Sequence, residues 1–507
     1  MGRTRMIAAV LLAALAAGPV RADDAAIRQR IDELEAQQRK FNEELQKLRQ
    51  LLDERPAAAA PAAVPAGTPP VLAPVVVPAG TAPAPAPAPV QAAEPARVEE
   101  VERKTGILTE EIRKIREFLV LPETQELKGY YGLGPAASKV YGIPRGLSIG
   151  GYSESNFKVI TENANGASDE FDLVRLVGYL GYKFNDRIVF NSEIEFEHTG
   201  SESSVSSGNG AVEVEFATLD YLFDPRLNAR AGLMLVPMGF INEVHEPPFY
   251  LGNVRPPVET QILPTTWRAN GAGLFGELAE GLEYKAYGLT SFNAKGYTTF
   301  NLRDARQSGN RERADDWSFV GRVDYGAPQI PGWSSGGSLY LGDQGQNEEY
   351  GNDDIGFTQA GVFTQIYEIH SEFMYRGLWL RALGTTALID DAGLLSQDDF
   401  IQAVTRGQPI GKVLLGAYTE VAYDLMPWLL PETTQYLAPW FRYSWLDTNN
   451  KVAAGFTRDK AARRYFYEFG LQYKPIPQIV LKADYHIQDA EQGTLPSEIR
   501  IGGGFVF

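Results

Sequence analysis

The last residues of the chain alternate between two faces and end on an aromatic side chain. Ile499, Ile501, Phe505 and Phe507 share one face of this run, and Arg500 lies on the other. In hydrocarbon every backbone N–H and C=O must be paired, so a sheet crosses a membrane only when it closes on itself and leaves no edge. The run therefore predicts the closing strand of an outer-membrane barrel, with Phe507 as a signal for the barrel-assembly machinery.

The same two-residue period extends back from the end to about Leu147. In 479–488, for example, apolar side chains alternate with Lys482, Asp484 and His486. Tight connections such as Asn185-Asp186 alternate with long polar ones, as in barrels with short periplasmic turns and long outer loops. A soluble β-sandwich or propeller would alternate too, but its loops are not sorted by length. We expect an all-β transmembrane barrel of about sixteen antiparallel strands and eight outer loops over 147–507.

The N-terminus predicts export. Two arginines precede an apolar stretch from Met6 to Ala17, and Val20-Arg21-Ala22 follows a Gly-Pro break. This pattern is typical of a secretory signal peptide over 1–22, cleaved after Ala22. The alternative, a membrane anchor, is disfavoured because the apolar stretch is shorter than the roughly 20 residues that a spanning helix needs.

The residues after the cleavage site predict an α-helical coiled coil over 23–54. Apolar side chains recur there at spacings of four and three, which is the a/d pattern of a coiled-coil seam. The predicted trimerising positions are Ile27, Ile31, Leu34, Phe41, Leu45, Leu48 and Leu52. A single amphipathic helix lying on another surface is the alternative interpretation.

Two further segments separate the coiled coil from the barrel. Residues 55–96 are almost wholly Pro and Ala, a composition that cannot bury a core and favours an extended linker. Residues 97–146 are predicted to form an amphipathic helix and a segment that leads into the barrel. The helix would plug or cap the periplasmic end of the barrel. We expect the whole N-terminal extension in the periplasm and the barrel in the cell outer membrane.

Composition excludes several functions. The formal net charge of −17 argues against nucleic acid as a partner, because nucleic acid is bound through an excess of Lys and Arg. Cysteine is absent, which removes disulfides, Cys-ligated metals and Cys nucleophiles. The expected surroundings are outer-membrane lipid and lipopolysaccharide.

The longest connection, Val236 to Asn270, is the third outer loop, and it is too rich in apolar residues and Pro to be a solvated loop. Tucked into the lumen it would narrow the pore and bury those side chains. The runs 230–239 (RAGLMLVPMG), 255–259 (RPPVE) and 271–276 (GAGLFG) resemble the phosphate-selective porins O and P and the wider family of Gram-negative outer-membrane porins. The resemblance covers 147–507.

This resemblance implies a homotrimer of sixteen-stranded barrels whose third loop folds inward, and some members of that family carry an N-terminal coiled coil. It implies a water-filled channel for passive diffusion of small hydrophilic or charged solutes, with anions such as phosphate as one option. The name of the family does not transfer as a substrate. Phosphate selectivity looks like the work of closely set Arg and Lys, since a desolvated anion needs several charge-assisted donors.

The residues expected at the pore constriction or in the lumen mix both signs of charge. They are Glu243, His245, Glu246, Arg255, Glu259, Arg268, Arg322, Arg381, Arg442, Lys482 and Arg500. Acidic residues such as Glu193, Glu195 and Glu468 share the lumen-facing register. The mixture favours a transverse field across a general pore over a ladder for one anion. Taken singly, each of these residues would be a solvated wall charge.

No catalytic motif appears in a supporting context, so we expect no enzyme and no cofactor. The histidines His198, His245, His370 and His486 do not show a two-His metal spacing. Glu368, His370 and Glu372 would share one strand face, which leaves a metal site open there, but lumen lining is the ordinary explanation and we expect no metal.

Two alternatives to a channel remain at this stage. In the first, the barrel is mainly an anchor, and the coiled coil and Pro/Ala arm tether the outer membrane to the cell wall through contact with peptidoglycan. In the second, the chain is a secreted, soluble β-rich protein that binds or hydrolyses carbohydrate.

Overall fold

The computed structural model describes residues 127–198, 210–431 and 433–507. They all belong to the second of two compact units of the chain, Glu111–Phe507. The predicted signal peptide, coiled coil and Pro/Ala linker lie outside the described residues, as does the predicted amphipathic helix before 127. Among the described residues every helix is too short or too polar to cross a bilayer.

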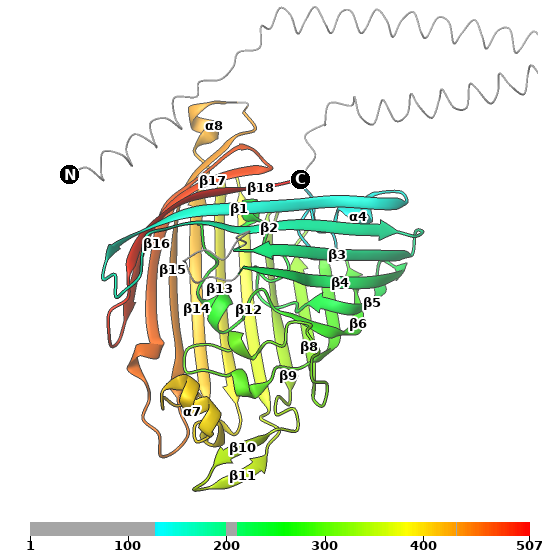
Figure 1. Ribbon diagram of the computed structural model, residues 1–507. Coiled ribbons are helices and arrows are strands. Elements are labelled where there is room, and N and C mark those ends of the chain that lie inside the picture. The colour runs from blue at the N-terminus through cyan, green and yellow to red at the C-terminus, as the bar shows by residue number, and fades with distance from the viewer. Residues whose placement is uncertain (1–126, 199–209, 432) are drawn as a thin grey trace, which may run out of the picture. The chain divides into compact units, whose positions relative to one another are not determined.

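The described residues form a closed barrel of sixteen antiparallel strands, as the alternating sequence predicts (Figure 1). Closure rules out the open sandwich and the propeller. The strands are β1 (Gly146–Glu162), β2 (Glu170–Lys183), β3 (Ile188–Glu197), β4 (Ala211–Asp224), β5 (Leu227–Leu235), β6 (Arg268–Ala279), β7 (Leu282–Thr290), β8 (Trp317–Gly326), β9 (Trp333–Gly342), β12 (Thr364–Tyr375), β13 (Leu378–Ile389), β14 (Val413–Tyr423), β15 (Tyr436–Lys451), β16 (Arg463–Ile476), β17 (Ile479–Ala490) and β18 (Ser497–Val506).

The first and last strands close the barrel. Tyr152 of β1 lies opposite Val506 of β18, and the antiparallel register continues from there along both strands. Beyond β18, Phe507 N–H donates to Gly151 O at 2.9 Å, and Gly151 N–H donates to Phe507 O at 3.1 Å. The pairing therefore reaches the final residue.

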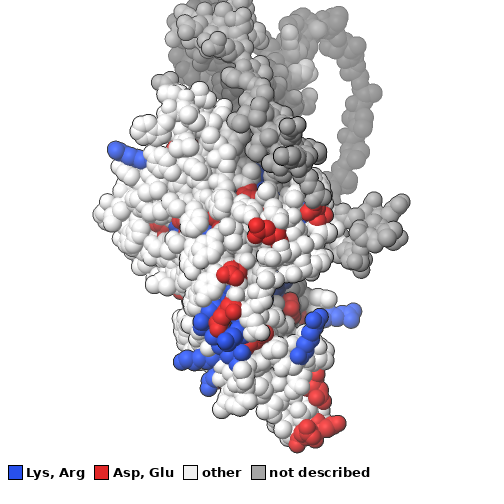
Figure 2. All heavy atoms as spheres, turned by 90° about the vertical axis from the view of Figure 1, so that its left-hand side faces the viewer, with Lys and Arg blue, Asp and Glu red and all other residues white. Residues whose placement is uncertain are grey.

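The wall has an apolar outside and a polar inside. In β17, Leu481 and Ile487 are 44% and 39% exposed, while the alternate residues Lys482, Asp484 and His486 are 3–4% exposed. These are the two faces that the sequence predicts for 479–488. Figure 2 shows a wall whose upper part is mostly uncharged, whereas charged side chains gather toward the lower end, where the long loops lie.

Connections at the two ends of the barrel differ in length. The long ones are 163–169, 198–210, 236–267, 291–316, 343–363, 390–412, 452–462 and 491–496. At the other end, connections such as 225–226 and 376–377 are tight, but 424–435 is longer and carries the helix α8 (Met426–Leu429). The long connections also hold a hairpin of β10 (Glu349–Asn352) and β11 (Gly356–Gln359), and short helices that include α6 (Ala392–Leu395) and α7 (Asp399–Thr405).

A segment that precedes β1 packs against the inner wall. It contains α4 (Lys139–Gly142), whose Val140 is 1% exposed. A Cβ on Gly181 of β2 would lie 2.6 Å from Val140 Cβ, so only glycine allows this approach. Asn191 of β3 donates to Ala137 O at 2.7 Å and fixes the segment further.

Replacing Phe507 separates its role in assembly from its role in stability. Its ring is 56% exposed on the outer face, so Phe507→Ala should change the free energy of unfolding by only about 0.5 kcal/mol. If the terminal side chain is the assembly signal that we predict, the fraction of folded barrel in membranes should nevertheless fall. Heat-modifiable gel mobility measures the folded fraction, and denaturant titration measures stability. Phe469→Ala, which removes an outward ring from the middle of the chain, is the control and should leave the folded fraction unchanged.

Candidate functional site

Loop 3, residues 236–267, lies inside the barrel rather than over its mouth. It contains the short helices η1 (Pro247–Phe249) and α5 (Val258–Gln261). Its apolar residues are buried, with Met238 and Ile241 each 1% exposed and Leu251 not exposed. This burial explains why the loop is rich in apolar residues, which a loop exposed to water would not be.

Cationic side chains of the wall hold loop 3 through its backbone carbonyls. A carbonyl outside a sheet needs a donor when it is buried, and a charged donor makes a stronger bond than a neutral one. The donors are Arg322 to Gly239 O (2.5 Å), Lys474 to Pro248 O (2.6 Å), Arg442 to Leu251 O (2.7 Å) and Lys482 to Gly252 O (2.7 Å).

Arg442 is the central contact between the loop and the far wall. Its guanidinium is fully buried and pairs with Glu420 at 2.8 Å and Glu468 at 3.3 Å on the neighbouring strands β14 and β16. The same group donates to Leu251 O. One cation therefore neutralises two wall carboxylates and anchors the loop between them.

The carboxylates of loop 3 point back to other parts of the barrel. Glu243 pairs with Lys285 of β7 at 2.5 Å. Glu259 accepts a hydrogen bond from the Tyr418 hydroxyl of β14 at 2.5 Å. Glu246 accepts the backbone N–H groups of Ala136 and Ala137, both at 3.0 Å, and so joins loop 3 to the segment before β1.

Burial raises the pKa of Glu246 to about 7 despite these two donors. Burial alone would lower the pKa of His245, but the facing carboxylates of Glu193 and Glu215 outweigh it and raise that pKa to about 10. Burial is thus the cause of the shift at Glu246, whereas two facing carboxylates cause the shift at His245.

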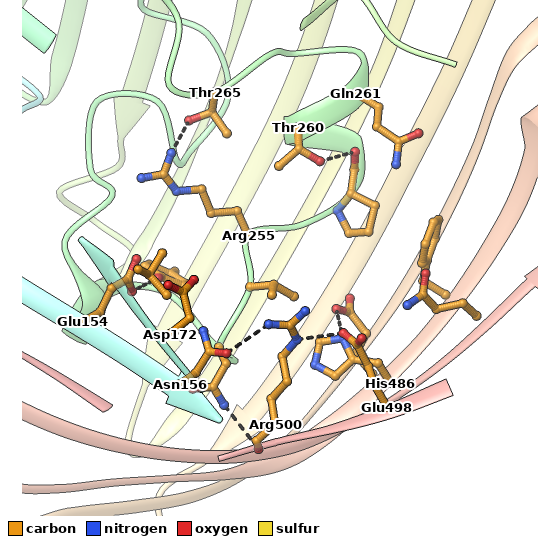
Figure 3. Close-up of a pocket in the computed structure, with 18 of the residues that line it drawn as sticks. Glu154, Asn156, Asp172, Arg255, Thr260, Gln261, Thr265, His486, Glu498 and Arg500 are labelled. Carbon is orange, nitrogen blue, oxygen red and sulfur yellow. Dashed lines mark hydrogen bonds and ion pairs between the residues drawn. The ribbon is translucent and has the colours of Figure 1, made fainter. Parts of the chain in front are cut away.

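Two cavities flank loop 3 and share no lining residue. The first, of about 430 Å³, lies toward the long connections (Figure 3). It is lined by the second half of the loop, including Arg255, and by wall residues such as Arg500. The second, of about 750 Å³, is lined by the first half of the loop, including Phe240, and by residues of the tight turn at Arg376. Loop 3 thus lies between the two.

Two acidic groups of the first cavity have arginine partners in the same lining. Glu498 pairs with Arg500 at 2.7 Å, and Glu154 pairs with Arg175 at 2.9 Å. Figure 3 shows Arg500 between Asn156 and Glu498 at the wall. Asp172 lies 2.7 Å from Nδ1 of His198.

Arg255 of loop 3 differs from these paired groups. Its Nη1 donates to Thr266 Oγ1 at 2.8 Å and to Thr265 Oγ1 at 3.4 Å. Its Nε and Nη2 are buried and have no hydrogen-bond partner among the described residues. Arg303, from the connection 291–316, lines the same cavity, and its pKa is lowered by burial and by the positive charges of Arg255 and Arg175. Four arginines balance four carboxylates in the lining of the first cavity, but Arg255 and Arg303 have no carboxylate partner among the described residues.

The structure divides the residues expected from the sequence into two groups. Arg255 and Arg500 line the first cavity, and Glu243, Arg322 and Arg381 line the second. The others line neither cavity and lie where loop 3 or neighbouring loops meet the wall: His245, Glu246, Glu259, Arg268, Arg442 and Lys482.

Sequence reasoning missed five cationic residues that line the cavities: Arg175, Lys285, Arg303, Arg376 and Lys474. Arg376 lies in a tight turn between two strands. Arg175, Lys285 and Lys474 occupy inward positions of β2, β7 and β16, so the two-residue period contained the signal. Arg303 lies in an irregular connection, and no periodicity indicates its direction.

No family model matches this chain. An uncharacterized protein of Aquifex aeolicus (strain VF5) is 35% identical over 384 residues, which cover 74% of this chain and 83% of that protein.

Solved structures with a similar arrangement are outer-membrane proteins. A loop L8 deletion mutant of OmpT from Vibrio cholerae matches 72% of this chain and 100% of its own, with 11% identity and a TM-score of 0.45. OmpF of Salmonella typhi, in complex with daunomycin, matches 72% and 98%, with 12% identity and a TM-score of 0.45. The anion-selective porin from Comamonas acidovorans matches 71% and 99%, with 13% identity and a TM-score of 0.41. Likeness at this level assigns no function.

Arg442→Met should destabilise the barrel strongly. It leaves the buried Glu420 and Glu468 without their shared cation, and breaking a buried pair in this way costs about 3–5 kcal/mol. Denaturant unfolding in detergent, followed by tryptophan fluorescence, measures the loss. Loop 3 should also become sensitive to trypsin at Arg255. Arg376→Met, on an exposed turn, is the control; equal stability of the two variants would contradict the anchoring role of Arg442.

Proposed function

This chain belongs to the same family as the Aquifex aeolicus protein, and we propose that it is an outer-membrane porin: a water-filled channel for passive diffusion of small hydrophilic or charged solutes. The observation that carries the proposal is a closed barrel with an apolar outer wall and two polar cavities within it, on either side of loop 3. A barrel with such an inside conducts without a chemical step, so the proposed function requires no catalysis.

The outer wall supports a position in a lipid bilayer. One row of residues in direct register across five strands is Leu380, Val421, Phe441, Phe469 and Tyr485. Each side chain of this row from Leu380 to Phe469 is 36–44% exposed. Large apolar side chains facing outward are stable in hydrocarbon and unfavourable in water.

Loop 3 forms the narrowest part of the proposed channel. It lies between the two cavities, and a solute that moves from one to the other must pass it. Since its carbonyls and carboxylates are held by wall residues, the loop acts as a fixed constriction rather than a mobile lid.

The charges along this path favour small anions. Arg255 and Arg303 line the first cavity without a carboxylate partner among the described residues, whereas Glu154 and Glu498 of the same lining are each paired with an arginine. Two unpaired guanidinium groups lower the energy of an anion there and raise that of a cation. They are too few to strip the hydration of one particular anion, so we propose a weak preference for anions, with phosphate among them, rather than a phosphate filter.

Planar bilayer recordings test whether the protein forms a channel and whether that channel prefers anions or cations. Purified protein should give discrete conductance steps, and the reversal potential in a KCl gradient should indicate chloride preference. In the double variant Arg255→Gln/Arg303→Gln the ratio of chloride to potassium permeability should fall roughly twofold, because the cavity loses its unpaired positive charge.

The matched control is Arg255→Lys/Arg303→Lys, which keeps both charges and should keep the preference. Absence of conductance steps from folded protein would overturn the channel. Conductance with an unchanged reversal potential in the Gln variant would overturn only the assignment of selectivity.

We further propose a homotrimer. Leu219, Ala231, Ala272 and Gly288 lie in direct register across β4 to β7, and all four face outward. The last three residues are small, whereas outward positions on other strands of the barrel carry large side chains. Such a flat strip allows a neighbouring barrel to approach closely and pack without lipid between them.

Ala272→Trp tests this interface, because a large ring in the strip would hold two barrels apart. The trimer should dissociate at a lower temperature, which seminative gel electrophoresis of the detergent-solubilised protein measures. Leu380→Trp, on a wall that we assign to lipid, should not change that temperature. If both substitutions act alike, the strip is not the interface.

The N-terminal extension completes the proposal. A cleaved signal peptide over 1–22 would direct export, and the coiled coil over 23–54 would assist trimer formation in the periplasm. The tether to peptidoglycan depends on these same residues, which lie outside the described part of the chain.

A further inference from the structure

His245 of loop 3 lies between two carboxylates of the barrel wall. Its Nε2 is 3.1 Å from Glu193 Oε1 of β3 and 3.2 Å from Glu215 Oε2 of β4. Its Nδ1 is 3.1 Å from Asn242 O. The three side chains are 0–2% exposed, and one ligand atom from each lies within 4.8 Å of the others.

The other two lumen histidines are arranged differently. His370 meets Glu368 through Nδ1 at 2.7 Å and Asp324 through Nε2 at 2.8 Å. His486 likewise uses Nδ1 for Glu468 and Nε2 for Asp484. In both rings each nitrogen faces its own carboxylate, so a ring with two N–H groups can donate one hydrogen bond to each.

At His245 both carboxylates converge on one nitrogen. Because Nδ1 faces a carbonyl oxygen, it carries a hydrogen and donates it. Nε2 has room for a single hydrogen, and the hydrogen-bond geometry holds for Glu193 alone. Glu215 Oε2 and the second oxygen of Glu193 are buried without a hydrogen-bond partner among the described residues. One proton therefore leaves the site unsatisfied, whereas a metal ion would accept all three ligands.

A histidine that donates Nδ1–H to a backbone carbonyl and offers Nε2 is the usual arrangement of a metal-ligating imidazole. The wall is shaped for the same purpose. Between Glu193 and Ile194 the register of β3 with β4 shifts, so that Glu193 lies opposite Phe216 and Glu215 is the extra residue. Such a bulge redirects a side chain, and here both Glu215 and Phe216 are buried.

The surrounding groups add a second indication. Arg175 lies 3.4 Å from the neighbouring Glu195, and Arg268 lies 3.8 Å from Glu215 Oε1, but among the described residues Glu193 has no Lys or Arg partner. The hydroxyl of Tyr152, whose ring packs edge-on against His245, is also buried and has no hydrogen-bond partner among the described residues. The site therefore contains buried oxygen atoms that are available as ligands.

We infer that Glu193, Glu215 and His245 bind one divalent transition-metal ion, which fastens loop 3 to β3 and β4. One imidazole with carboxylate oxygens suits Zn²⁺ or Mn²⁺, whereas Ca²⁺ and Mg²⁺ prefer oxygen alone. The ion joins loop 3 to two paired strands of the wall. This role is structural and does not depend on which solute the channel passes.

Zinc binding tests the site in the full-length protein. Because the ligands are buried, the chain is refolded into detergent with Zn²⁺, desalted, and analysed by mass spectrometry for bound metal. Wild type should retain about one Zn²⁺ per chain, and its thermal midpoint should rise with Zn²⁺. Glu215→Gln and His245→Gln should bind Zn²⁺ at least roughly tenfold more weakly, since even losing a partner of a metal ligand costs that much.

His370→Gln and His486→Gln are matched controls, because each removes a buried imidazole flanked by two carboxylates. Both should retain the zinc. The inference is overturned if wild type holds no more Zn²⁺ than Glu215→Gln, or if a control loses as much as His245→Gln. Should His245→Gln fail to fold, Glu215→Gln and the Zn²⁺ dependence of the wild-type midpoint still decide, and an unchanged midpoint overturns the site.

Discussion

Pairing of β1 with β18 is the constraint on which the rest of the molecule depends. Once the two strands pair as far as Phe507, no backbone group of the barrel's sheet is left at an edge, and the sheet can lie in hydrocarbon. Closure also fixes which face of each strand is inside. The two-residue period then separates the chain into a lipid-facing set and a lumen-facing set. The polar interior is therefore a consequence of closure, and the site is built from what faces inward.

The lumen uses charge to hold an irregular segment in place. Loop 3 cannot pair its backbone in a sheet, so its buried carbonyls need donors from elsewhere. Arg442, Lys482 and Lys474 supply them from the wall, and Glu420 and Glu468 neutralise Arg442 in turn. Arg255 and Arg303, which have no carboxylate partner among the described residues, line the first cavity and do not hold the loop to the wall through ion pairs. Charged side chains that have ion-pair or carbonyl partners hold the structure together, whereas those with neither kind of partner among the described residues remain available to a solute.

Much of the fold could be predicted from the sequence because the barrel repeats one local rule. Alternation in 479–488 and the terminal Phe507 indicate strands and closure without knowledge of any contact. The inward position of loop 3 also follows from local composition, since Met238, Ile241 and Leu251 could not remain in water. The segment with α4 was harder to foresee, because its position depends on Gly181 and Asn191 of strands that follow it.

The roles of single lumen residues could not be predicted, because they depend on geometry between distant strands. Arg442 and Arg500 have the same sequence signal, an arginine at an inward position, yet the first is fully buried under loop 3 and the second lines a cavity. Glu215 is placed by a bulge, which breaks the period that sequence reasoning relies on. The path of loop 3 decides whether a given charged side chain holds the loop or lines a cavity. That path depends on the folded barrel and cannot be read from local sequence.

An apolar contact between loop and wall would be at least as stable as these buried ion pairs. The lumen cannot use one throughout, because the same inner face must stay wetted around the two cavities, and an apolar inner wall would make a solute path unfavourable to water and ions. Charged side chains meet both needs. Charged side chains beneath loop 3 bind its carbonyls and carboxylates. Charged side chains that the loop does not cover line the water-filled cavities. The position of loop 3 against the polar wall therefore determines both the stability of the constriction and the charge that a passing solute meets.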